Sequence, residues 1–116
     1  MTTSKENLHE AAIIIASELE MTPEEAGKIT RYNEYEALKG FLAERIKHLL
    51  EYETEKLKYV LYRIDVSEQK AHDALANHTL EEGANNIAEL ILQREIQKAI
   101  TRKQYASQPV DPDLAL

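Results

Sequence analysis

The sequence predicts an all-α helical bundle, and three observations lead to that fold class. Glycine and proline each occur only three times in 116 residues, so little interrupts a helix. Apolar residues recur at intervals of three and four, which is the spacing of one helix face. No Asn-Gly or Asp-Gly pair marks a hairpin between alternating strands. We therefore expect one helical domain over residues 1–106 and a disordered tail over 107–116, where prolines and acids accumulate.

Three shorter helices are expected, at about 5–20, 23–30 and 67–76. The first has an apolar face that comprises Leu8, Ala11, Ala12, Ile15 and Leu19. A capping box from Thr22 to Glu25, with Pro23 at the first helical position, predicts the start of the second. Asp65 or Ser67 can cap the third, and Asn77 is a left-handed terminator after it.

Two long helices are expected, at about 34–64 and 80–105. The first would be a rod roughly 45 Å long, with an apolar face that comprises Tyr35, Leu42, Ile46, Leu49, Leu50, Leu57, Val60, Leu61 and Ile64. Its opposite, solvated side would carry Glu44, His48, Glu55 and Tyr62. The second helix starts at a capping box from Thr79 to Glu82 and has apolar residues on two neighbouring arcs.

A carboxylate interrupts the apolar face of the first long helix. Glu53 falls between Leu49 and Leu57, where a charged group must be neutral, paired or hydrogen-bonded. Arg94, near the apolar arc of the last helix, is a candidate partner, and Glu95 raises the same question on that helix. A buried ion pair that fixes helix register is one interpretation, and a polar pocket in the bundle is the other.

The apolar residues in excess of one core predict an interface and a homodimer. Leu92 and Ile96 lie about 100° and 140° from Ile91 on the helical wheel, away from the first apolar arc. Tyr52 and Tyr59 widen the apolar side of the first long helix. Because a rod of about 30 residues is longer than the shorter helices available to cover it, we expect a second copy to cover Leu92 and Ile96; the alternative is that the last helix is the central element of its own bundle. Tyr52 and Tyr59 are either part of this interface or the edge of a core.

The C-terminal half carries a resemblance to known proteins. Its residues are Leu61–Glu68 (LYRIDVSE), followed by Ala88–Ile91 (AELI), Arg94 and Gln97-Lys98. This pattern resembles one in small uncharacterised bacterial helical proteins. The resemblance implies a bacterial origin and an all-helical fold, and it implies no activity, cofactor or catalytic residue.

Composition and motifs favour a binding or assembly role over catalysis. The chain lacks cysteine, a glycine-rich phosphate loop, a nucleophile elbow and a His-Glu-x-x-His motif. The longest fully apolar run, Ala11–Ala16, is too short to span a bilayer, and the absence of cysteine fits a reducing compartment. We therefore expect a cytoplasmic, non-enzymatic interaction module without a cofactor.

Two other functions stay open. One is a small-molecule or metal-binding bundle, for which Glu6 and His9 form one Glu-x-x-His pair without a second copy. The other is a nucleic-acid accessory protein that uses the basic residues of 94–103. A net charge of −7 disfavours nucleic acid as a partner.

Overall fold

The computed structural model describes residues 4–107, with side chains through residue 105, and this part of the chain contains six helices and no strand. They are α1 (Lys5–Glu18), α2 (Pro23–Ile29), α3 (Tyr35–Tyr52), α4 (Thr54–Ile64), α5 (Glu68–Leu75) and α6 (Leu80–Ser107). The all-α fold class is therefore confirmed. Ser107, expected in a disordered tail, ends α6; the rest of that expected tail lies outside the described residues.

Helix starts follow the local signals in the sequence. The Thr22 side chain accepts a hydrogen bond from the Glu25 N–H at 3.2 Å, and Glu25 accepts one from the Thr22 N–H. Thr79 and Glu82 form the same reciprocal pair at the start of α6, at 3.1 and 2.9 Å. Ser67 caps α5. Each cap satisfies backbone donors that have no partner within the helix.

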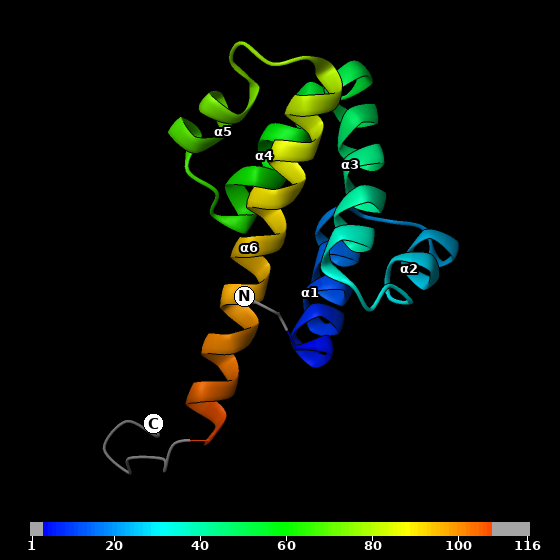
Figure 1. The fold of residues 1–116 in the computed structure, drawn as a ribbon, viewed down its shortest axis with the longest axis vertical. Coiled ribbons are helices and arrows are strands. Elements are labelled where there is room, and N and C mark those ends of the chain that lie inside the picture. The colour runs from blue at the N-terminus through cyan, green and yellow to red at the C-terminus, as the bar shows by residue number, and fades with distance from the viewer. Residues whose placement is uncertain (1–3, 108–116) are drawn as a thin grey trace.

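The long helix expected over 34–64 is instead two helices, α3 and α4, and that expectation is wrong. Glu53 has a non-helical backbone (φ −141°, ψ 55°), and the chain changes direction there (Figure 1). The Thr54 hydroxyl donates to the Leu50 carbonyl at 3.3 Å, a local bond that competes with helix geometry. The break lets α4 fold back against α6 and α1 rather than run past them.

Helix α6 is the central element of the bundle. It packs against α1, α3, α4 and α5, and its C-terminal end extends beyond the other helices (Figure 1). Both apolar arcs of α6 are buried by these neighbours, through Ala84, Ile87, Ala88, Ile91, Leu92, Ile96 and Ala99. Because one chain covers both arcs, the second arc needs no second copy.

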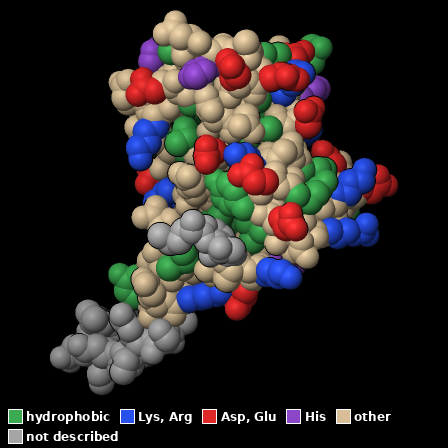
Figure 2. Space-filling model, viewed as in Figure 1, with side chains coloured by type: hydrophobic (Ala, Val, Ile, Leu, Met, Phe, Trp, Pro, Cys, Tyr) green, Lys and Arg blue, Asp and Glu red, His purple; other side chains and the backbone are tan. Residues whose placement is uncertain are grey.

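The surface mixes charges of both signs. On the face shown in Figure 2, acidic and basic side chains are interspersed, and hydrophobic side chains gather over α1. Ile13 of α1 is 49% exposed. Within residues 4–107, no helix is long and apolar enough to cross a membrane.

Candidate functional site

The structure separates Glu53 from Arg94, which the sequence analysis paired. Glu53 lies at the break between α3 and α4 with 43% of its side chain exposed, and its Oε2 atom is 3.8 Å from His48 Nε2. Arg94 Nη2 instead pairs with Asp65 Oδ2 at 3.2 Å. The expectation of a buried Glu53 is wrong. The helical wheel that predicted its burial assumed one continuous helix over residues 34–64, and that helix is interrupted at Glu53.

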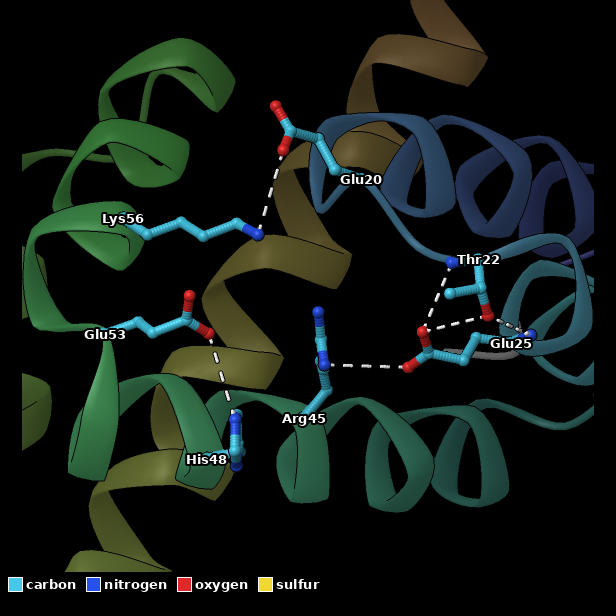
Figure 3. A network of polar contacts seen from close by, with 7 residues as sticks. All are labelled: Glu20, Thr22, Glu25, Arg45, His48, Glu53 and Lys56. Atoms are coloured by element: carbon cyan, nitrogen blue, oxygen red, sulfur yellow. Dashed lines mark hydrogen bonds and ion pairs between the residues drawn. The ribbon is translucent and has the colours of Figure 1, made fainter.

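Figure 3 shows the polar contacts around this break. Lys56 Nζ lies 3.8 Å from Glu20 Oε2, and Arg45 Nη1 lies 3.6 Å from Glu25 Oε2. The Lys56–Glu20 pair joins α4 to the segment between α1 and α2, and the Arg45–Glu25 pair joins α3 to α2. Partly exposed pairs of this kind contribute about 1 kcal/mol or less each. We therefore interpret the network as surface structure and not as a binding site.

In the part of the chain that the structure describes, the carboxylate of Glu95 is buried. Its side chain is fully buried, and its Oε1 atom accepts a hydrogen bond from Lys98 Nζ at 2.9 Å. Its Oε2 atom has no hydrogen-bond partner among the described residues. Because Lys98 is one turn further along the same helix, the pair does not connect two helices and cannot fix their register.

Two of the four expected interface residues lie in the core of the chain itself. Leu92 is fully buried and Ile96 is 8% exposed, so the expectation that they form an open interface is wrong. The reason is the central position of α6, which sequence periodicity does not reveal. Tyr52 and Tyr59 are 72% and 58% exposed, and their role in an interface stays a prediction.

A groove lies between α4 and α5, with a volume of about 910 Å³. We call it the α4–α5 groove. Apolar side chains from three helices and the connecting loop line it: Leu50, Leu57, Leu61, Val66, Ala71 and Leu75. Polar and aromatic residues also line it: Thr54, Lys58, Tyr62, Arg63, Asp65, Ser67, Glu68 and His72. An apolar surface with polar groups beside it is typical of a site that binds an amphipathic partner.

Helix α5 forms one wall of the groove and packs against α6. None of its eight residues is buried. Leu75 packs close to Gly83 of α6, where an added Cβ atom would meet Leu75 Cδ2 at 2.9 Å. The Asn86 side chain donates to the Ala74 carbonyl at 3.0 Å. Glycine at position 83 thus permits the close approach that seats α5 on α6.

The two residues that flank α5 have left-handed backbones. Asp65 (φ 69°) ends α4, and Asn77 (φ 62°) follows α5. Aspartate and asparagine tolerate this conformation better than most residues because their short polar side chains bond locally. These two turns set the angle of α5 and hence the width of the groove. The sequence predicted Asn77 as a terminator, and the structure confirms its conformation.

Tyr62 is an aromatic residue of the groove, a role that the sequence did not predict. It is 81% exposed and lines the groove, whereas Tyr59, three residues earlier, does not. The helical wheel for residues 34–64 assigned Tyr62 to a solvated side opposite the core, and its exposure agrees with that prediction. The groove itself depends on how α4 and α5 pack, which a helical wheel does not describe.

The basic end of α6 is mostly paired with acids. Arg94 and Lys98 have the carboxylate partners described above, and Lys103 Nζ lies 3.2 Å from Glu6 Oε1. Such pairs reduce the positive field that a nucleic acid would meet. Among the described residues, no group of three or more His, Asp or Glu side chains is arranged to hold a metal ion.

Comparisons with protein-family models, with curated proteins and with solved structures found no match for this chain.

Proposed function

We propose that this protein is a non-catalytic interaction module that holds an amphipathic helix of a partner protein in the α4–α5 groove. The observation that carries the proposal is the groove itself, about 910 Å³ with apolar residues from α3, α4 and α5. Helix-in-groove recognition places apolar residues of the ligand, spaced by three and four, into such a surface. No covalent chemistry is needed for that role.

The exposed groove residues support a protein partner. Tyr62 is 81% exposed and Leu75 is 37% exposed, and both face the groove. Tyrosine is enriched at the centres of protein interfaces because it combines a large apolar area with a hydroxyl group. Charged side chains lie beside the apolar residues of the groove. Lys58 pairs with Glu55, and Arg63 pairs with Glu18. A polar rim around an apolar centre is typical of protein interfaces.

A small-molecule ligand is the second candidate function, and the volume of the groove favours it. Ligand pockets commonly enclose about 300–1,000 Å³. A small apolar ligand would contact Leu57, Leu61 and Leu75 and would not need Tyr62. The two candidates therefore differ in how strongly binding depends on this tyrosine.

A matched pair of variants tests the proposal. We would select amphipathic helical peptides against the protein and map the bound peptide by amide chemical shifts. Tyr62→Asp should weaken binding at least about tenfold, which corresponds to 1.4 kcal/mol. Tyr59→Asp, on the same helix but outside the groove, should change affinity less than about twofold. Peptide binding that maps elsewhere, or that ignores Tyr62→Asp, would refute the proposal.

The proposal includes a cytoplasmic location and a homodimer. The absence of cysteine supports a reducing compartment. For the dimer, the surface first expected at Leu92 and Ile96 is buried, so a different face must carry self-association. A fusion to a fluorescent protein checks the location, and light scattering checks the mass.

A further inference from the structure

Helix α5 lies at the edge of the bundle and packs mainly against one other helix, α6 (Figure 1). None of its eight residues is buried. Its ionisable side chains, Glu68, Lys70, His72 and Asp73, are all exposed. The contacts that hold α5 in place are therefore concentrated on one side, toward α6.

These contacts combine apolar packing with one side-chain hydrogen bond. Leu75 packs on Gly83, and the Asn86 side chain donates to the Ala74 carbonyl at 3.0 Å. Ala71 and Ala74 are partly buried against the core. An isolated helix shorter than about 12 residues is marginal in water, so α5 depends on this packing to stay helical.

The two ends of the segment that contains α5 are anchored on the bundle. Asp65 Oδ2 lies 3.2 Å from Arg94 Nη2, which ties the end of α4 to α6. Thr79 and Glu82 exchange hydrogen bonds at the start of α6. Between these anchors, the left-handed residues Asp65 and Asn77 flank α5. Hinges are commonly a few residues at the ends of an element that absorb a change in φ and ψ.

Leu75 has two roles at the contact between α5 and α6. Its side chain lines the α4–α5 groove, and it also covers Gly83, which is buried. If α5 leaves α6, Leu75 is released and Gly83 is uncovered, so the groove widens toward α6. A helix with its side chains is about 10–12 Å across, and a wider groove admits more of its surface.

We infer that α5 is a hinged lid of the α4–α5 groove, which leaves α6 in a minor state of the free protein and admits the partner helix in that state. The entry of the partner rests on the proposed function, whereas the movement of α5 does not. Because only the undocked fraction admits the partner, the association rate constant is proportional to that fraction. Holding α5 on α6 should therefore slow binding.

Hydrogen exchange of the free protein tests the movement of α5. Asn86→Ala removes the hydrogen bond to the Ala74 carbonyl, so it should raise the undocked population and speed the exchange of the α5 amides by about threefold to tenfold. Asn85→Ala, at the exposed neighbouring position of α6, is the control and should change these rates less than about twofold. Exchange of α5 amides that is as slow as that of α3 amides, or that ignores Asn86→Ala, overturns the lid.

A disulfide between α5 and α6 tests the coupling of this movement to binding. An added Cβ atom at position 83 would lie 3.9 Å from the Leu75 Cα atom, which is close enough for the pair Leu75→Cys and Gly83→Cys to form a disulfide. The chain has no other cysteine, so the bond is unambiguous. Oxidation should slow the exchange of the α5 amides and lower the association rate constant of a selected amphipathic peptide, each by about tenfold or more. The reduced form of the same protein is the control, and reduction should restore both rates.

The two measurements separate the lid from the proposed function. If the oxidised and reduced forms bind the peptide at equal rates, the lid is overturned, while the proposed function stands because the peptide still binds. If neither form binds a peptide, the proposed function fails. The exchange rates of the free protein then decide whether α5 moves, because they do not depend on any ligand.

Discussion

Replacing the buried carboxylate Glu95 by methionine should leave the protein as stable as before or more stable, by about 1–3 kcal/mol. Full burial of a carboxylate costs several kcal/mol, and its hydrogen bond to Lys98 returns about 1.5–3 kcal/mol. The Oε2 atom, which has no partner among the described residues, adds about 1–3 kcal/mol of penalty. Methionine has a similar length and no polar group, and it adapts to irregular packing.

Removing the other partner of this pair, Lys98, should lower the stability of the protein. Lys98→Met removes the one partner seen for Glu95 and leaves a buried carboxylate uncompensated, which typically costs about 3–5 kcal/mol when burial is complete. Glu95→Met leaves Lys98 with its side chain 27% exposed, so the ammonium group can reach water. This asymmetry between the two partners is the main feature of the prediction.

Urea denaturation followed by circular dichroism measures both variants. In a domain of about 100 residues, 1 kcal/mol also corresponds to a shift of roughly 4 °C in Tm. Glu81→Met is the control, because the Glu81 side chain is 77% exposed and pairs with Lys47 at the surface; it should change stability by less than about 1 kcal/mol. If Glu95→Met destabilises the protein by more than about 1 kcal/mol, the pair is net stabilising and the reasoning fails.

Three further predictions concern single positions. Gly40→Ala should stabilise the protein by about 0.5–1 kcal/mol in urea denaturation, since a Cβ atom at this exposed position of α3 meets no atom within 4 Å. Gly83→Ala should increase the free energy of unfolding by less, because its Cβ atom would meet Leu75. Equal increases for the two variants would contradict the packing of α5. The Thr22 backbone N–H holds the pKa of Glu25 below its ordinary value of 4.5, so Glu25 stabilises the fold above that pH and the contribution is lost as the pH falls through the lowered pKa. A titration by nuclear magnetic resonance should show the lowered pKa in the protein and only a partial return toward 4.5 in Thr22→Ala, which removes the Thr22 hydroxyl hydrogen bond to Glu25 at 3.1 Å and keeps the backbone N–H. Glu53→Ala should change the urea midpoint by an amount equivalent to less than about 1 kcal/mol, because its pair with His48 is exposed; a loss of about 3 kcal/mol would instead indicate burial.

The sequence alone determined the all-α class and most helix boundaries. Local chemistry suffices for these: the Thr22 and Thr79 capping boxes, the cap at Ser67 and the left-handed Asn77 each act within a few residues. The apolar face of α1 also followed from spacing. These features depend on neighbours in sequence, which a single chain displays directly.

The tertiary structure decided where the long helix breaks and which apolar residues are covered. Glu53 carries no proline or glycine signal, and the packing of α4 against α6 overrides its local preference for a helix. Likewise Leu92 and Ile96 have the same periodicity whether a second copy or this chain's own helices cover them. The groove beside Tyr62 arises only once the turns at Asp65 and Asn77 set the angle of α5. Each outcome depends on contacts between residues far apart in the chain, and periodicity reports only the face of a helix, not what lies against it.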